Sequence, residues 1–171
     1  MKGKKAPLVS VVMGSDSDLP LMEEAMKVLQ DFQVPHEIFL TSAHRAPQRT
    51  SEFAAGAAGR GVRVIIAGAG AAAHLAGVIA SQTPLPVIGV PIDATSLKGL
   101  DALLATVQMP GGIPVATMAV GKAGAKNAAL LAVRILALTD ARLQKRLAVF
   151  VEGMAKDVET RHKGMLKKLN T

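Results

Sequence analysis

Short apolar segments alternate along this chain with stretches of helical spacing, and this alternation restricts its possible folds more than any other feature. The segments at residues 9–13 and 64–67 are rich in valine and isoleucine, as is typical of strands buried on both faces of a parallel sheet. Three further short apolar segments also alternate with stretches of helical spacing. We therefore predict five strands, at residues 9–13, 37–40, 64–67, 87–90 and 115–120.

A stretch of helical spacing follows each predicted strand. In the first of them, Met22, Ala25, Met26 and Leu29 lie on one face of a helix. Strands that alternate with helices form a parallel sheet with right-handed crossovers, which places helices on both faces. We therefore predict an α/β protein with a flavodoxin-like, three-layer α/β/α sandwich. Its predicted helices are residues 19–32, 48–58, 75–81, 97–107 and 123–138.

A final helix is predicted beyond the sheet, where Thr139 and Asp140 provide an N-terminal cap. Its apolar residues form one stripe, and lysines and arginines occupy the other face. A stripe of this kind packs on its own domain or on a neighbouring subunit, so we expect a homo-oligomer. We expect a single domain over residues 1–171, with a basic tail at 1–7, an α/β core at 8–138 and a C-terminal helix at 139–171. The stripe consists of Leu143, Leu147, Phe150, Met154 and Val158.

The positive charge of the chain is concentrated at its two ends. The formal net charge is +7, but residues 6–139 contain nine basic and nine acidic residues. Because the chain also has no Trp and no Tyr, it lacks the stacking surfaces of single-stranded nucleic-acid binders. We therefore expect no nucleic-acid partner. The excess of basic residues comes from Lys2, Lys4 and Lys5 and from the segment after residue 139.

Cysteine usage and hydropathy bear on the compartment. The chain has no Cys, and its start does not have the form of a signal peptide, so we expect a cytoplasmic protein. The segment between Arg63 and Asp93 has no acidic or basic residue and is long enough to span a bilayer. Prolines and His74 interrupt it, and two buried strands joined by a short helix explain it better. We therefore expect no membrane contact.

A polar turn directly follows the first predicted strand. Ligands of open parallel sheets bind beyond the carboxyl ends of the strands, where helix N-termini offer free N–H groups. Gly14 permits close approach of a ligand to the backbone, and the hydroxyls of Ser15 and Ser17 can donate to phosphate oxygens. Asp18 suits sugar hydroxyls better than phosphate. The alternative is that these residues only cap the helix.

A second polar loop, which contains Ser42, His44 and Arg45, follows the next predicted strand. Histidine can both give and take a proton near neutral pH, and arginine can bind phosphate with two parallel donors. Because this loop is predicted to lie at the same sheet edge as the first turn, a functional role is favoured over that of an ordinary surface histidine. The two loops together predict a site for a phosphorylated ligand.

Residues 68–73 offer a competing interpretation. Their sequence matches the glycine-rich dinucleotide fingerprint, and Asp93 follows about twenty residues later. The match carries little information in a chain rich in Ala and Gly, and the helix after it is short. The alternatives are a dinucleotide-binding oxidoreductase and a glycine loop that lets a substrate lie against the backbone.

Other common motifs are absent from the sequence: we find no Walker sequence, no nucleophile elbow and no histidine pair with metal spacing. Residues 108–114 form a loop rich in Pro and Gly that could close over a ligand.

These motifs resemble the N5-carboxyaminoimidazole ribonucleotide mutase family of purine biosynthesis, in the same order and over residues 9–138. The resemblance implies a cofactor-free enzyme, usually a homo-octamer, that moves a carboxylate from the exocyclic nitrogen to carbon 4 of the imidazole. We also expect no metal, because the sequence contains no cluster of metal-ligating residues. The motifs are residues 13–18, 42–45, 67–70, 72–75, 89–91, 108–110, 121–122 and 127–129.

The resemblance also implies roles for individual residues. His44 would be the catalytic proton shuttle and Asp18 would bind the ribose hydroxyls. Ser15, Ser17, Ser42 and Arg45 would bind the phosphate. The full set implied to contact the substrate is Gly14, Ser15, Ser17, Asp18, Ser42, Arg45, Ala69, Gly70, Ala72, His74 and Leu75.

The chain departs from the family pattern at two positions, with Ala71 where Gly is expected and Ala76 where Pro is expected. Both changes concern the shape of the pocket. Two further alternatives stay open: a relative that carboxylates aminoimidazole ribonucleotide directly, and a regulatory mononucleotide-binding module without catalysis.

Overall fold

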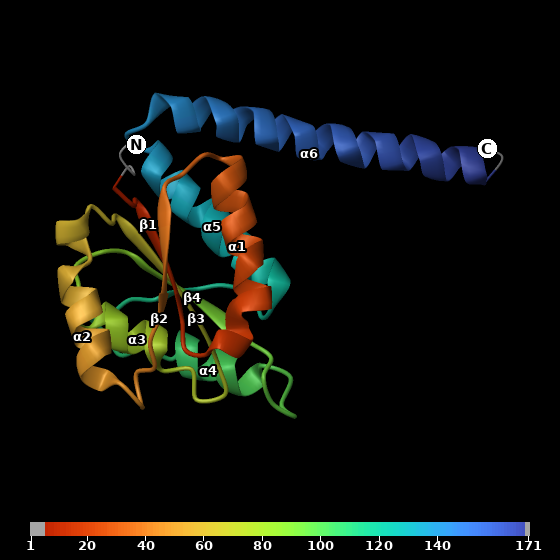
Figure 1. The fold of residues 1–171 in the computed structure, drawn as a ribbon. Coiled ribbons are helices and arrows are strands. Elements are labelled where there is room, and N and C mark those ends of the chain that lie inside the picture. The colour runs from red at the N-terminus through yellow and green to blue at the C-terminus, as the bar shows by residue number, and fades with distance from the viewer. Residues whose placement is uncertain (1–5, 170–171) are drawn as a thin grey trace. The chain divides into compact units, whose positions relative to one another are not determined.

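The computed structural model describes residues 6–169 and contains one five-stranded parallel sheet. The strands lie in the order β2-β1-β3-β4-β5, so β1 and β3 are neighbours in the interior of the sheet (Figure 1). Every strand pair is parallel. Lys2, Lys4 and Lys5 of the predicted basic tail lie outside the described residues. The strands are β1 (Val9–Met13), β2 (His36–Leu40), β3 (Val64–Gly70), β4 (Val87–Ile92) and β5 (Ala116–Thr117).

Helices cover both faces of this sheet. The helices α1 and α5 lie on one face and α2, α3 and α4 on the other, which confirms the predicted three-layer α/β/α sandwich (Figure 1). Two short 3-10 helices, η1 (Asp16–Asp18) and η2 (Ala58–Arg60), lie in the connections. The helices are α1 (Leu19–Asp31), α2 (Pro47–Gly56), α3 (Leu75–Ala80), α4 (Leu100–Val107), α5 (Lys122–Ala137) and α6 (Ala141–Lys168).

Side-chain alternation along the strands builds a core on each side of the sheet. Val12 and Ile65 point toward α2 and α3, where Phe53 is among the residues they pack with. On the other face, Gly68 lets α1 pack closely, because a Cβ there would overlap the side chain of Met22. On the same side of the sheet, Glu24 of α1 forms ion pairs with Lys27 of α1 and with Lys126 of α5. The second ion pair connects the two helices.

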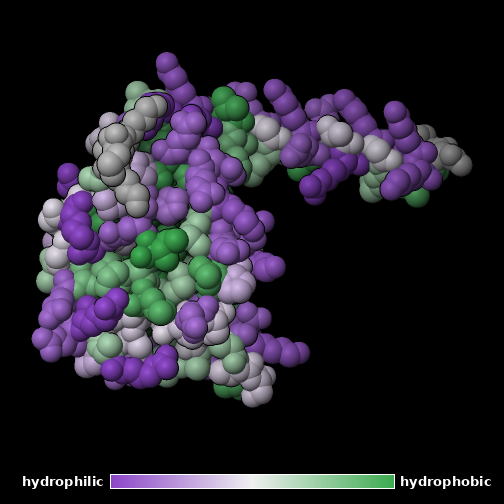
Figure 2. Space-filling model, viewed as in Figure 1, coloured by the Kyte–Doolittle hydropathy of each residue, from purple (hydrophilic) through white to green (hydrophobic). Residues whose placement is uncertain are grey.

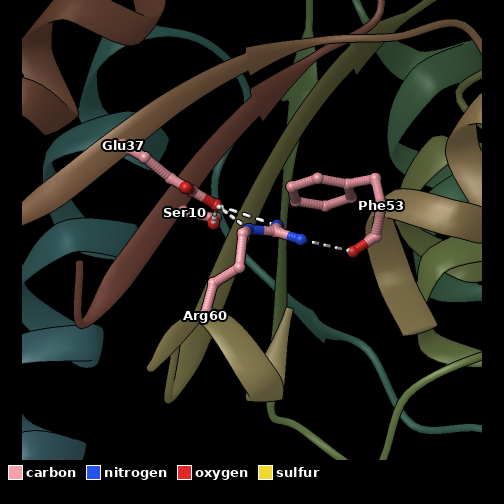
Figure 3. A network of polar contacts seen from close by, with 4 residues as sticks. All are labelled: Ser10, Glu37, Phe53 and Arg60. Carbon is pink, nitrogen blue, oxygen red and sulfur yellow. Dashed lines mark hydrogen bonds and ion pairs between the residues drawn. The ribbon is translucent and has the colours of Figure 1, made fainter. Parts of the chain in front are cut away.

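A polar network connects the first two strands to the segment after α2 (Figure 3). The hydroxyl of Ser10, which is fully buried, donates to Oε1 of Glu37. Arg60 donates to the same oxygen through Nη2 at 2.9 Å and Nε at 3.3 Å, and its guanidinium lies over the ring of Phe53. Because the carboxylate has charged donors, the network satisfies the buried hydroxyl as well as the ion pair.

Two elements, β5 and α4, are shorter than predicted by three or more residues. The fifth strand contains only Ala116–Thr117 instead of 115–120. The carbonyl of Pro91 accepts from Gly121 N–H, so the missing N–H of this proline would have faced β5, and the ladder ends there. Helix α4 begins at Leu100 instead of residue 97, because Lys98 and Gly99 have positive φ angles of 50° and 84°. Conversely, β3 and β4 continue to Gly70 and Ile92, beyond their predicted ends.

The chain divides into two compact units, one ending at Ile135 and one beginning at Leu136. In the second unit, Asp140 caps α6 by accepting from the N–H groups of Arg142 and Leu143. The predicted apolar stripe lies on this helix, with Leu143 buried and Val158 exposed. Among residues 6–169, no helix is long and apolar enough to cross a membrane.

Candidate active site

A cavity of about 360 Å³ lies where the first three strands end. Three loops surround it: the turn after β1, the loop after β2 and the segment that follows the end of β3. This agrees with the rule that parallel sheets bind ligands beyond their carboxyl ends, where β1 and β3 flank the point at which the strand order reverses. The lining residues are Gly14, Ser15, Ser17, Asp18, Ser42, Ala43, His44, Arg45, Ala69, Gly70, Ala71, Ala72, Leu75 and Ala94.

The turn after β1 caps a short helix and also lines the cavity. Ser15 Oγ accepts from Ser17 N–H at 3.3 Å, and Asp18 Oδ2 accepts from Ser15 N–H at 3.2 Å, which forms a capping box. The Ser17 hydroxyl donates to Ser15 Oγ at 2.8 Å. Capping therefore does occur at this turn, and it orients both hydroxyls in the wall of the cavity.

Asp18 is a buried carboxyl, with 6% of its surface exposed. Burial raises its pKa above the ordinary value, and the charge of Asp16 raises it further. Hydrogen bonds from Ser15 and Ser17 act in the opposite direction and lower the pKa, but the effect of desolvation is larger. Its carboxylate is therefore poorly solvated and is suited to accept hydrogen bonds from hydroxyl groups of a ligand.

The loop after β2 brings Arg45 to the first turn. Ala46 N–H donates to the Ser42 carbonyl at 2.8 Å, and Arg45 N–H donates to Ser42 Oγ at 3.2 Å. The Arg45 guanidinium lies 3.5 Å from the carbonyl oxygen of Gly14, at the limit of a hydrogen bond. The charged group that the sequence assigned to phosphate therefore lies beside the serines of the first turn.

Two histidines from different loops meet at this site. His44 Nε2 lies 2.8 Å from Nδ1 of His74, and the rings are almost perpendicular, at 84°. A hydrogen bond between two imidazole nitrogens requires that only one of them carries a proton. The pair therefore couples the proton on His44 to the tautomer of His74. His74 itself contacts His44 and is not among the residues that line the cavity.

The third wall of the cavity consists of small and apolar residues at the end of β3 and directly after it. Gly70 is close-packed, because a Cβ there would lie 2.6 Å from the Cβ of Ala94. Both glycines of the apparent dinucleotide fingerprint, Gly68 and Gly70, belong to β3 itself, and the following α3 has only six residues. In a dinucleotide site the glycine turn leads into a long helix that carries the pyrophosphate. The dinucleotide interpretation is therefore not favoured.

The structure adds two lining residues that the sequence did not identify, Ala43 and Ala94, and it also places Ala71, a departure from the family pattern, in the lining. Ala43 and Ala71 lie between assigned residues. Ala94 follows β4, so the rule that sites gather at strand ends could have identified it. The loop at residues 108–114 does not line this cavity, and its residues Gly112, Ile113 and Pro114 line a separate one with residues 80–87. Among residues 6–169, no cluster of three or more His, Asp or Glu side chains could hold a metal ion.

The chain is an α/β protein whose cavity lies at the switch point of a doubly wound sheet, which is the usual place for a small-molecule site in this class. Residues 8–157 match the AIR carboxylase family. The chain belongs to this family, as its motifs indicated.

Several relatives of the chain carry the name of the mutase, and one that is 49% identical, from Candida glabrata, carries the name phosphoribosylaminoimidazole carboxylase. The N5-carboxyaminoimidazole ribonucleotide mutase of Pyrococcus horikoshii is 56% identical over 163 residues, which cover 95% of this chain and 90% of the relative. The enzyme of the same name from Synechocystis is 60% identical over 132 residues, covering 77% of this chain and 74% of the relative. The crystal structure of Treponema denticola PurE matches with a TM-score of 0.80 and 29% identity, covering 90% of this chain and 95% of that chain.

Proposed function

We propose that this protein is an N5-carboxyaminoimidazole ribonucleotide mutase, which converts that nucleotide to 4-carboxy-5-aminoimidazole ribonucleotide in purine biosynthesis. The mutase names belong to relatives that match over most of their own length, whereas only 27% of the carboxylase relative is covered, and this supports mutase activity over direct carboxylation. The observation that carries the proposal is the cavity that brings the serine turn, the His44 loop and the small-residue wall together at one sheet edge.

The polar side of the cavity is proposed to bind the ribose phosphate. Arg45 offers a planar pair of donors to the phosphate, and the hydroxyls of Ser15, Ser17 and Ser42 lie in the same wall. Asp18, whose carboxylate lacks solvent, accepts hydrogen bonds from the ribose hydroxyls. This division leaves His44 free for the chemistry.

One histidine suffices for the reaction because the two half-reactions balance in protons. In the first, the bond between the exocyclic nitrogen and the carboxylate carbon breaks, carbon dioxide leaves and the nitrogen takes a proton from His44. In the second, carbon 4 forms a bond to carbon dioxide and releases its proton to His44. The reaction thus needs a single group that gives and takes a proton. The hydrogen bond between His44 and His74 holds the His44 ring in position between the two steps.

Carbon dioxide must stay bound between the two steps. Ala69, Gly70, Ala72 and Leu75 offer a wall of small and apolar groups for this purpose. Such a wall excludes water, which would otherwise compete for the intermediate. We further propose that the enzyme works without a cofactor or metal, as a cytoplasmic homo-octamer.

The test of this function is the substitution His44→Asn. We expect turnover to fall by about a hundredfold to ten-thousandfold or more, because the proton shuttle serves both half-reactions. Binding of the product nucleotide, measured by calorimetry, should be largely preserved, because phosphate and ribose contacts come from other residues. His162→Asn, which changes an exposed histidine of α6, is the matched control. Retained turnover in His44→Asn would remove this residue from the mechanism.

A further inference from the structure

Two buried threonines bound the loop that carries Ser42, His44 and Arg45. Thr41 directly follows β2 and Thr50 lies in the first turns of α2, and both side chains are buried. Their hydroxyl oxygens are 2.9 Å apart. The two ends of the loop at residues 42–46 are therefore joined by a hydrogen bond that water does not reach.

The direction of this hydrogen bond follows from the partners of Thr50. Thr50 Oγ1 also lies 3.1 Å from the carbonyl oxygen of Ala46, which can only accept. Since a hydroxyl has one proton, Thr50 donates it to Ala46, and Thr41 must then be the donor to Thr50. The result is a chain with a single direction, from Thr41 through Thr50 to the Ala46 carbonyl.

Backbone contacts extend this chain to both sides of the site. Thr41 N–H donates to the carbonyl of Met13 at 3.1 Å, directly before the turn after β1. Ala46 N–H donates to Ser42, and its carbonyl also accepts from Thr50 N–H at 3.1 Å. The threonine chain thus connects the start of the loop, which is attached to β1, with its end, where α2 begins.

We propose that Thr41 and Thr50 are positioning residues, whose hydroxyl chain holds the loop where His44 reaches His74 and Arg45 reaches the first turn. The inference rests on the proposed function, since it concerns the residues assigned to that reaction. Other loop conformations would leave buried hydroxyls without partners, which is unfavourable. Proton transfer depends steeply on geometry, and a displacement of about 1 Å can cost a hundredfold in rate.

The test compares substitutions that remove one or both hydroxyl contacts. Thr50→Val breaks both, and we expect kcat to fall by about tenfold to a hundredfold, with a smaller change in KM. Thr50→Ser keeps the hydroxyl and should restore kcat. Thr41→Val breaks only the first contact, so its loss should be smaller, and the double variant should match Thr50→Val alone. Equal losses for the two single variants would contradict the central place of Thr50, which makes both hydroxyl contacts.

A matched control separates positioning from general destabilisation. Ser10→Ala removes another buried hydroxyl bond of the β1–β2 pair, in the network of Figure 3, without touching the loop. All variants are compared at a temperature where circular dichroism shows them fully folded. A fall in kcat for Ser10→Ala equal to that for Thr50→Val would overturn the proposal.

A second measurement is independent of the reaction. Amide hydrogen exchange of Arg45 and Ala46 reports on the loop directly. We expect faster exchange at both amides in Thr50→Val and wild-type exchange in Ser10→Ala. If the wild-type protein did not turn over the carbamate nucleotide, the proposed function would fail while this readout still tested the loop. Unchanged exchange in Thr50→Val would overturn the positioning role.

Discussion

At the scale of single residues, Asp18 predicts how stability depends on pH. Its pKa is raised in the folded chain, so folding favours the protonated form. The stability that this preference contributes is fully present below the unfolded pKa, near 3.8, and is lost as the pH rises through the folded pKa. At neutral pH the ionised carboxylate therefore makes the unliganded protein less stable than a neutral group of the same shape would.

Asp18→Asn tests this reasoning. We expect the variant to have a higher free energy of unfolding than the wild type at neutral pH, because it removes a desolvated charge and retains the capping oxygen. The difference should shrink as the pH falls toward and below 3.8, where Asp18 is protonated in both states. Urea denaturation of both proteins across this range measures it. A difference that does not vary with pH would contradict the assigned cause.

Arg45→Lys tests the phosphate contact. The substitution keeps the charge but replaces a planar pair of donors with a point charge, so one charge-assisted hydrogen bond is lost. Such a contact contributes about 1.5 to 3 kcal/mol, on the order of a tenfold to hundredfold weaker binding of the substrate. Arg63→Lys changes an exposed arginine at the opposite end of β3 and should leave binding unchanged. An unaltered dissociation constant for Arg45→Lys would place Arg45 outside the phosphate site.

The two departures from the family pattern also have residue-scale explanations. Ala71 has a φ angle of 53°, in the left-handed region that glycine adopts at little cost. This backbone conformation explains why Gly is expected at position 71. Ala76 lies in the first turn of α3, where proline is tolerated because no intrahelical N–H is needed. The resemblance identified positions 71 and 76, and the backbone conformation at each position accounts for the residue type that the family pattern has there.

At the scale of elements, the sequence predicts where strands and helices lie better than where they end. Apolar runs placed all five strands, since burial on both faces leaves a clear pattern. The ends depend on single contacts that no periodicity records. The missing N–H of Pro91 ends β5 early, and the left-handed conformation of Lys98 and Gly99 delays the start of α4. The hydrogen bond between His44 and His74, from loops thirty residues apart, is likewise a property of the folded chain.

Close packing at the start of α5 gives a prediction at this scale. A Cβ at Gly124 would overlap the backbone carbonyl of Ala119, which cannot move as a side chain can. We expect Gly124→Ala to lower the free energy of unfolding by about 3 kcal/mol or more. Gly153 lies within α6 with open space around its Cα, so Gly153→Ala should raise stability by about 0.5 to 1 kcal/mol. Chemical denaturation of the pair measures both effects, and equal behaviour would refute the packing argument.

At the scale of the whole molecule, the described chain exposes apolar surface on more than one element. Leu100, Leu104 and Val107 recur along one face of α4 and are each about half exposed, at 55%, 49% and 48%. Ile38 and Leu40 of the edge strand are similarly exposed, and Figure 2 shows an apolar patch over β2, between α1 and α2. The sequence predicted association from the stripe on the last helix, but these faces become visible only when the strands and helices are placed.

The last prediction is therefore the mass of the protein in solution. Exposed apolar patches mark contacts with other chains, and homo-oligomers of closed symmetry are the usual result. We expect light scattering to give a mass near eight times the single-chain 17.7 kDa. Replacing Leu100 and Leu104 together with Glu should reduce that mass, because charges on the α4 face oppose its burial. Gln30→Glu, at an exposed polar position of α1, should leave it unchanged. A wild-type mass of one chain would contradict the proposed octamer and leave the exposed α4 face without a partner.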